Sequence, residues 1–476
     1  MNNICLALPE IFIALAGFLL LLLSAERGEK GLSLVGALTA LSFVVGAFLV
    51  GTLPESGLAF SDMFIVDGLA RFSKILLLIV AALSLFLAPS YLKDTKSAKP
   101  EYAVLLLFAA LGMMIMISAH DLMSLYVGLE LQNLALYVLV SFQRDSKKSS
   151  EAGLKYFILG SVSSAILLLG ISFLYGATGG TGFEVLKTGS GAGFALGTAF
   201  VLAGFAFKIA AVPFHVWAPD VYEGAPTPVT AFLLAAPKIA GLVLLARVLA
   251  GPLASAHEIW QPILIFFAVA SMVLGAFGGL AQTNLKRLMA YSAITNSGVM
   301  LIGLALLNQP QAAVAGFAGT LLYLALYFMG TFGLFAGLLL VRCKGMPVEK
   351  VKDLSGLFKT HPTLGACMAA LLFSLAGIPP LAGFFGKYNV LLAAVKGDAI
   401  WLAVVGVLAS VVAAAYYLRV IKVMVFDPPP TQALEVVSDK TLHALALLAA
   451  AAVVLFVVMP APLMNGAQEA SISLLP

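Results

Sequence analysis

Apolar runs of about twenty residues recur along the whole chain, separated by short polar segments. A helix that crosses the roughly 30 Å hydrocarbon core of a bilayer needs about twenty such residues. Only 11% of the 476 residues are charged, against about 25% in a typical soluble protein. The runs are continuous rather than alternating, so they exclude a β-barrel as well as a water-soluble globule. The sequence predicts an all-α, polytopic membrane protein.

These runs are numerous enough for about fourteen transmembrane helices. We expect the spans at residues 6–24, 32–53, 64–88, 102–119, 122–142, 154–175, 194–217, 229–250, 262–281, 288–307, 313–341, 364–395, 400–426 and 442–462. No Lys- and Arg-rich segment is interleaved with aromatic residues, which argues against a nucleic-acid partner. Neither a metal-binding Cys or His spacing nor a nucleotide-binding glycine loop occurs, so we expect no cofactor on this chain.

Lys and Arg residues gather on one set of loops. Most of those outside the apolar runs follow odd-numbered spans, and only a few lie on the other side. Loops rich in Lys and Arg stay on the cytoplasmic side of a membrane. We therefore expect both termini on the outer side.

Three lysines lie deep inside the apolar runs, where a charge costs roughly 2.5–3.5 kcal/mol on insertion scales. A Lys near the end of a span avoids this cost, because its long side chain reaches the interface. Lys208 and Lys238 lie nine residues from the inner ends of their spans, about 13 Å deep and beyond that reach. Lys387 lies eight residues from the outer end of its span. Buried ionisable residues of this kind line ion pathways, so we predict a functional role for all three.

Glu130 is an acid inside an apolar span, and Lys155 lies near the start of the next span. If the hairpin between them turns near Asp145, their positions differ by about 7 Å along the helix axis, which two long side chains or one water can close. We predict that Lys155 pairs with Glu130, with an interfacial position for Lys155 as the alternative. Four lysines facing one acid favour a proton relay over a set of static salt bridges.

Two spans contain prolines beside a buried lysine. Pro213 follows Lys208 by five residues, and Pro379 and Pro380 precede Lys387 by eight and seven residues. A proline removes a helical hydrogen bond, and in lipid such a break persists only where protein or water satisfies the freed groups. The broken spans lie five spans apart, which predicts two five-helix repeats. Because five is an odd number, the repeats would be inverted relative to each other.

The repeats divide the chain into four parts. We expect an N-terminal three-helix segment at residues 1–100, a first repeat at 101–250, a second repeat at 251–428 and a C-terminal span at 429–476. Each repeat contains one broken helix near the bilayer midplane, where transporters built from repeats place their ion sites.

The segment FHVWAPDVYEGAPTPVTAFLLAAPK, residues 214–238, is a highly specific motif. Together with Glu130 in the fifth span and LAGIPPLAGFFGK at residues 375–387, it resembles the antiporter-like membrane subunits of respiratory complex I, the proton-pumping NADH–quinone oxidoreductase. The resemblance covers essentially the whole chain. It implies two inverted five-helix repeats packed beside sister subunits in a membrane arm.

The resemblance also implies roles for individual residues. Glu130 and Lys155 would form the coupling pair, Lys208 the central relay, Lys238 the bridge and Lys387 the group near the outer exit. Sister subunits would bind NADH, FMN, iron–sulfur clusters and quinone, with no cofactor on this chain. The protein would be a non-redox, proton-translocating subunit of a hetero-oligomer in the lipid bilayer of the bacterial inner membrane, with both termini in the periplasm.

One position departs from the family pattern. The tenth span reads YSAITNSG at residues 291–298, and Asn296 stands where the family often has His. Asn cannot take up a proton, so the link from Lys238 to Lys387 would depend on water. The candidate water-binding residues are His215, Thr295, Asn296 and Tyr323.

Two other functions are alternatives. Multi-subunit cation/proton antiporters share this fold and much of the central motif, so the chain could belong to one of them. Lys238 after Pro237 and the scarcity of buried acids argue against an antiporter, because a Na⁺ site needs several oxygen ligands. A scaffold that moves no ions is the other alternative, and it would tolerate Leu at the buried lysines. The free-energy cost of burying these lysines argues against it, because a scaffold has no need of them.

Overall fold

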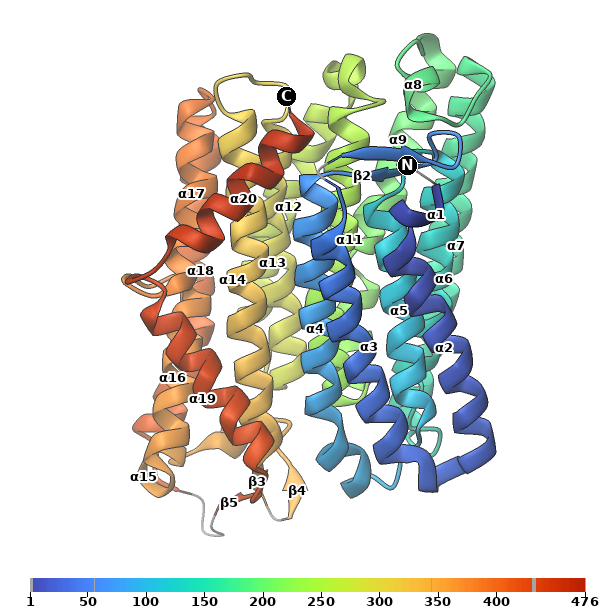
Figure 1. Cartoon of the computed structure of the whole chain (residues 1–476). Helices are drawn as coiled ribbons and strands as arrows, with labels where there is room; N and C mark the ends of the chain where they lie inside the picture. The colour runs from blue at the N-terminus through green and yellow to red at the C-terminus, as the bar shows by residue number, and fades with distance from the viewer. Residues whose placement is uncertain (1–2, 55, 344, 430–433, 476) are drawn as a thin grey trace.

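The computed structural model describes residues 3–54, 56–343, 345–429 and 434–475. Long helices run roughly alongside one another, and within these ranges the short strands lie in the connecting loops (Figure 1). Both chain ends lie at one end of the bundle, here called the termini end. Strands β3, β4 and β5 lie at the other end, called the lysine-rich end because the loops with Lys93, Lys96 and Lys99 are found there. The expected all-α membrane fold is confirmed.

The first part of the chain contributes three long helices. The hairpin of α2 and α3 packs against α4, while a small two-stranded sheet covers its termini end. The elements are α1 (Asn3–Leu6), α2 (Leu8–Arg27), the 3-10 helix η1 (Gly28–Gly31), α3 (Leu32–Thr52), β1 (Gly57–Ala59), β2 (Phe64–Val66) and α4 (Gly68–Asp94).

Two five-helix repeats of opposite direction follow: the first begins at the lysine-rich end and the second at the termini end. The first repeat has α5 (Glu101–Ile117), α6 (Leu122–Val140), α7 (Lys147–Thr178), α8 (Phe183–Leu186), α9 (Gly191–Lys208), α10 (Trp217–Gly224) and α11 (Thr227–Ala250). The second has η2 (Ala254–Ala256), α12 (His257–Leu280), α13 (Leu285–Ala305), α14 (Ala313–Leu340), β3 (Val341–Cys343), β4 (Met346–Pro347), η3 (Val351–Leu354), α15 (Leu357–Thr360), α16 (Pro362–Ala376), α17 (Ala382–Lys396) and α18 (Ile400–Val425). Helices or broken helices occupy all fourteen expected spans.

The C-terminal span is longer than expected. After β5 (Glu435–Val436), α19 (Lys440–Leu455) starts at the lysine-rich end, and α20 (Ala461–Leu474) continues beyond Pro460 to the termini end (Figure 1). The predicted span ended at residue 462, because polar residues dilute the apolar pattern of α20. Ser471 Oγ donates to the carbonyl oxygen of Val314 at 2.9 Å, and the Leu69 amide donates to Ser473 Oγ at 2.8 Å. The last helix therefore joins α4 to α14.

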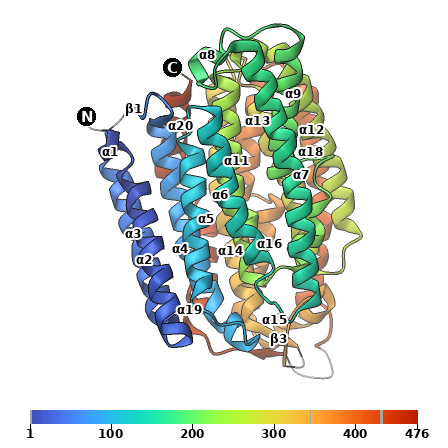
Figure 2. The ribbon, with the colours of Figure 1, turned by 90° about the vertical axis from the view of Figure 1, so that its right-hand side faces the viewer.

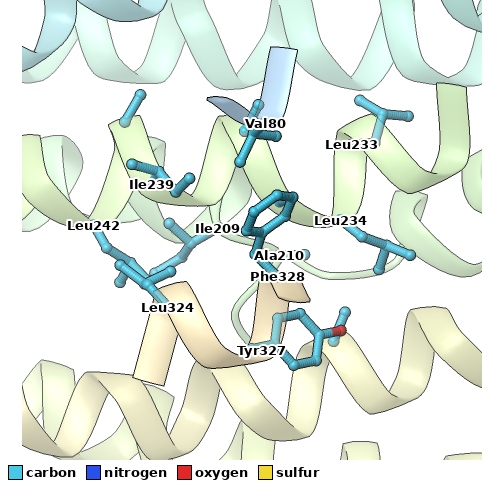
Figure 3. Packing of buried hydrophobic residues seen from close by; sticks show 14 of the residues in the cluster. Val80, Ile209, Ala210, Leu233, Leu234, Ile239, Leu242, Leu324, Tyr327 and Phe328 are labelled. Carbon is cyan, nitrogen blue, oxygen red and sulfur yellow. The ribbon is translucent and has the colours of Figure 1, made fainter. Parts of the chain in front are cut away.

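Helices α11, α13 and α14 form the buried centre, enclosed by the outer helices seen in Figure 2. Figure 3 shows apolar side chains of α11 and α14 in contact with the chain that follows α9. Ile209 comes directly after Lys208 and Ile239 directly after Lys238, and both belong to this cluster. Two of the predicted lysines therefore lie next to a tightly packed apolar core.

The two broken helices have the same local geometry. Ala210 has a φ of +57° and Gly377 a φ of +86°, and each stands three positions before a proline that follows a cis peptide bond. These prolines are Pro213 and Pro380, so both predicted helix breaks are present.

Neighbouring groups satisfy the backbone atoms that the breaks set free, as a membrane-embedded break requires. The Val212 amide donates to Ser271 Oγ at 2.9 Å in the first break. In the second, the Gly383 amide donates to Ser374 Oγ at 2.9 Å. A serine hydroxyl thus holds each break, from the neighbouring helix α12 in the first and from α16, the first half of the broken helix, in the second.

Candidate functional site

Lys208 is the last residue of α9, and the break that follows leaves its side chain inside the bundle. Its Nζ donates to Asn133 Oδ1 at 3.1 Å, and Asn133 Nδ2 donates to Glu130 Oε1 at 3.0 Å. Both partners lie on α6, one helical turn apart. Ser164 Oγ of α7 donates to the same carboxylate oxygen at 2.5 Å. Glu130, Asn133 and Lys208 therefore form one hydrogen-bonded chain.

The predicted pairing of Glu130 with Lys155 is wrong. Ser164 faces Glu130 on α7, and Lys155 lies nine residues earlier on that helix, about 13 Å nearer the lysine-rich end. The reason is an asymmetric hairpin. Helix α6 ends ten residues after Glu130, whereas Ser164 lies seventeen residues after the start of α7. Helix α7 therefore extends about two turns further than α6.

Lys155 belongs instead to a charged cluster at the lysine-rich end. Its Nζ lies 2.8 Å from Asp220 Oδ2 and 2.7 Å from Glu151 Oε1, while Arg287 Nη1 lies 2.6 Å from Asp220 Oδ1 and 3.2 Å from Glu223 Oε2. Partial burial raises the pKa of Asp220, but hydrogen bonds from Lys155 and Arg287 outweigh it and hold that pKa below its ordinary value. A pocket of about 180 Å³ lies beside these residues. The interfacial alternative for Lys155 agrees with its position, because its side chain is 41% exposed.

Lys238 lies in the middle of α11 and is 2% exposed. Its Nζ donates to the carbonyl oxygen of Ala293 at 2.7 Å and to Ser297 Oγ at 2.8 Å, both on α13. Within the described ranges no carboxylate forms an ion pair with this amine. Lys238 is therefore a buried amine whose partners are a hydroxyl and a carbonyl.

Polar side chains continue from Ser297 toward the second break. On the same helix, Asn296 Oδ1 accepts a hydrogen bond from Tyr323 Oη of α14 at 2.7 Å. Asn296 Nδ2 donates to Ser292 Oγ at 3.4 Å, and Ser292 is hydrogen-bonded in turn to the Tyr417 hydroxyl. Two of the candidate water-binding residues, Asn296 and Tyr323, are thus in direct contact.

Lys387 lies in α17 just beyond the second break, and it is 5% exposed. Its Nζ donates to the carbonyl oxygens of Ala376 at 3.1 Å and Leu375 at 3.3 Å, which the end of α16 leaves free. Tyr323 packs so tightly on Gly386 that a Cβ atom there would lie 2.5 Å from its ring. Tyr323 of α14 therefore contacts both Asn296 of α13 and the residue next to Lys387.

The remaining two candidate water-binding residues make fewer contacts. Thr295 Oγ1 donates to the carbonyl oxygen of Tyr291 within its own helix at 3.0 Å. His215 lies in the first break, and its buried Nδ1 has no hydrogen-bond partner in the described part of the chain. Their roles stay predictions.

Sequence reasoning missed two buried ion pairs near the termini end. Lys74 Nζ of α4 lies 2.5 Å from Glu10 Oε1 of α2, and Arg247 of α11 makes a bidentate contact with Asp67 at 2.6 and 3.0 Å. Lys74 and Arg247 are among the few bases that the Lys and Arg distribution assigns to the outer side of the membrane, and they are 0% and 3% exposed. The sequence indicates such a pair only by an acid near the end of one span and a base near the end of another.

These side chains give a row of ionisable groups across the bundle, from Glu130 on α6 through Lys208 and Lys238 to Lys387 on α17. Hydroxyl, amide and carbonyl groups satisfy each member. A change of charge at one group alters the proton affinity of its neighbours, so such a row can transmit protonation changes. The described residues contain no group of three or more His, Cys, Asp or Glu that could hold a metal ion.

Comparison with known proteins agrees with this arrangement. Residues 119–413 match the family described as NADH:quinone oxidoreductase/Mrp antiporter, transmembrane region. The chain is 48% identical over 474 residues to NADH-quinone oxidoreductase subunit N of Rhodospirillum rubrum, covering 98% of this chain and 96% of the relative. It is 46% identical over 480 residues to the subunit N of Paramagnetospirillum magneticum, covering 98% and 97%.

Solved structures share the fold. A chain of respiratory complex I from Thermus thermophilus superposes with a TM-score of 0.82 at 30% identity, covering 96% of this chain and 98% of that one. A chain of the Mrp complex from Dietzia sp. superposes with a TM-score of 0.82 at 22% identity, covering 99% and 96%, which shows a common fold. This chain therefore belongs to the NADH:quinone oxidoreductase/Mrp antiporter family and, within it, to the NADH-quinone oxidoreductase N subunits.

Proposed function

We propose that the chain translocates protons as a membrane subunit of an NADH–quinone oxidoreductase, and that its buried row of ionisable groups carries this function. The observation that supports the proposal most directly is the hydrogen-bonded chain of Glu130, Asn133 and Lys208. It connects an acid that lies partly exposed on α6 to the first buried lysine. A charge change near Glu130, driven by quinone reduction elsewhere in the complex, would reach Lys208 electrostatically and then Lys238 and Lys387.

Protons would enter from the lysine-rich end, which we place in the cytoplasm, and leave toward the termini end in the periplasm. The Lys-rich loops support this orientation. The open charged cluster of Lys155, Asp220 and Arg287 lies at the proposed inlet. A proton would pass the ionisable residues in the order in which they lie from α6 to α17, so Lys387 would be the last. The division into segments 1–100, 101–250, 251–428 and 429–476 matches this scheme, with one helix break in each repeat.

Lys208→Met tests the proposal in the assembled complex. Met keeps most of the side-chain volume but cannot carry a proton, so both quinone reduction and proton pumping should fall strongly. Lys187→Met is the matched control, because Lys187 is an exposed base that pairs with Glu184 and directly follows α8 at the termini end. Wild-type rates of both reactions in Lys208→Met would overturn the proposal.

The electron carriers belong to other chains in this scheme. We propose that NADH, FMN, iron–sulfur clusters and quinone bind to sister subunits, and that this chain contributes no cofactor chemistry. The respiratory complex from Thermus thermophilus supports a multi-subunit setting. Purification of the native complex through a tag on this chain should recover flavin- and iron–sulfur-containing subunits.

The relatives favour this function over a cation/proton antiporter. Identities of 46–48% connect the chain to oxidoreductase N subunits, whereas the likeness to the Mrp complex, at 22% identity, concerns the fold. Growth rescue of an antiporter-deficient strain at high sodium would instead favour the antiporter.

A further inference from the structure

Two grooves meet at Lys99, at the lysine-rich end of the bundle, the first lined mostly by apolar residues and the second by apolar and polar residues together. The first, here called the α3 groove, lies between α3, α4 and α5 and has a volume of about 360 Å³. The second, the α6 groove, lies between α2, α5 and α6 and has a volume of about 690 Å³. Lys99 lines both grooves, so they flank the start of α5 on either side.

The α3 groove is almost wholly apolar and has the depth of one leaflet. Its wall on α3 runs from Leu32 to Ala40, about 12 Å along the helix axis, compared with about 15 Å for half of a bilayer core. Gly36 adds open space, because a Cβ atom there would touch nothing within 4 Å. An acyl chain that starts at the lysine-rich surface can therefore lie in this groove without crossing the midplane.

The α6 groove begins at the same surface and follows α5 as far as Phe108. Tyr102, which lines the α3 groove, packs edge to face on Phe142, which lines the α6 groove, with ring centroids 5.4 Å apart. This aromatic pair forms a partition between the two grooves. A ligand that fills both grooves must branch into two apolar arms, one on each side of the partition.

The polar groups at the mouths of the grooves favour an anion. Lys99 and Arg144 are exposed there, and neither side chain has an acidic partner among the residues that the structure describes. Glu101 is the one acid on either wall, so bases outnumber acids. The Tyr102 hydroxyl is buried and has no hydrogen-bond partner among the described residues.

We propose that one anionic phospholipid occupies both grooves, with its phosphate beside Lys99 and one acyl chain in each groove. Two apolar arms joined at one anionic group match the divided shape and the charge of this site. A protein helix, about 10 Å wide, would not divide around the partition. Lys residues next to a transmembrane helix attract the anionic lipids of a cytoplasmic leaflet.

Lipid retention by the purified complex tests this assignment. The complex is delipidated, incubated with vesicles of equal parts phosphatidylglycerol and phosphatidylcholine, and washed, and the bound lipid is counted by native mass spectrometry. We expect phosphatidylglycerol to be retained in preference to phosphatidylcholine. Lys99→Gln should weaken this retention about fivefold, the effect of one Lys at an anionic surface, whereas Lys93→Gln, which lines neither groove, should change it less.

Gly36→Leu tests the groove itself, because Gly36 lines the α3 groove and a Cβ atom there would have no neighbour within 4 Å. Gly51→Leu is the matched control: it lies on the same helix, it also has open space, and it is outside both grooves. We expect loss of one phosphatidylglycerol per complex in the Gly36 variant alone. Equal retention of the two lipids, equal effects of the Lys99 and Lys93 variants, or loss of a sister subunit instead of lipid in Gly36→Leu would each overturn the proposal.

Discussion

Asn133 connects an acid to a base through one side-chain amide. Its oxygen accepts from Lys208 and its nitrogen donates to Glu130, so both ends of the amide are used. Hydrogen bonds in series polarise one another inside a low-dielectric interior. The charge on Glu130 therefore affects Lys208 through a fixed geometry rather than through a mobile ion pair.

Asn133→Leu should uncouple these two groups. The change removes the partner of a buried Lys, which costs about 1–3 kcal/mol, and we expect proton pumping by the assembled complex to fall roughly tenfold. Gln132→Leu is the control, because Gln132 is the preceding residue and is equally buried, whereas the hydrogen bond from Lys208 goes to Asn133. Pumping measured with a pH-sensitive dye in proteoliposomes compares the two. Equal losses in both variants would contradict the bridging role.

The depth of each buried lysine in the membrane could be predicted from the sequence. The residues of neighbouring helices that contact Glu130 and the lysines could not. Lys208, Lys238 and Lys387 are buried as expected, because their distance from the span ends exceeds the reach of a lysine side chain. The partner of Glu130 depends on where α6 ends and α7 begins, and apolar runs locate those points only to within a few residues. A polar residue one turn from Glu130 was the available signal for Asn133.

Asp67 gives a pH-dependent contribution to stability. Burial raises its pKa, but the charge and hydrogen bonds of Arg247 outweigh burial and hold the pKa below the ordinary 3.8. A lowered carboxyl pKa stabilises the folded protein above pH 3.8, and this contribution is lost as the pH falls through the folded-state pKa. Asp67→Asn should therefore cost about 3–5 kcal/mol at pH 7, because it leaves Arg247 buried and unpaired.

Thermal unfolding in detergent at pH 7 and pH 3 tests the Asp67 prediction. The midpoint of Asp67→Asn should lie below that of the wild type at pH 7, and the difference should shrink at pH 3. Glu184→Gln removes an exposed pair with Lys187 and should leave the midpoint unchanged. A difference that is the same at both pH values would show that the ion pair is not its cause.

At the scale of elements, the two broken helices are equivalent in backbone geometry but differ in where they place their lysine. Lys208 precedes its break, whereas Lys387 follows the other. The residue with positive φ is Ala in the first break and Gly in the second. A Cβ atom on Gly377 would lie 3.0 Å from Lys387 Cδ, so any other residue in the second break would displace the end of this lysine side chain. The prolines revealed both breaks in the sequence, while this steric difference depends on the packed structure.

Gly377→Ala should therefore affect Lys387 as well as the fold. The left-handed backbone costs an L-residue about 1–3 kcal/mol, and the new methyl group would push the lysine away from the carbonyl oxygens that hold it. We expect a lower unfolding midpoint and reduced proton pumping. Gly176→Ala in α7 is the control, because that position is helical and has open space. A wild-type pumping rate in Gly377→Ala would show that the position of Lys387 is not critical.

On the scale of the whole molecule, the few basic residues lie in two kinds of place, on loops and inside the bundle. The loops of the lysine-rich end carry exposed bases, whereas the bases inside the bundle are held by specific partners. The apolar runs predicted the fourteen spans, because bilayer thickness fixes the length of a helix. They could not predict that α20 lies against α4 and α14, since these contacts join residues 404 and 157 positions apart in the sequence through small and polar side chains.

The orientation of this molecule can be tested with two of its own cysteines. Cys5 is exposed at the termini end, and Cys343 lies partly exposed at the lysine-rich end. If the lysine-rich end faces the cytoplasm, a membrane-impermeant maleimide added to right-side-out vesicles should label Cys5, and it should reach Cys343 only after permeabilisation. Cys5→Ser and Cys343→Ser identify each labelled peptide by mass spectrometry. Labelling of Cys343 alone in intact vesicles would reverse the orientation and, with it, the proposed direction of proton transfer from the Lys155 cluster toward Lys387.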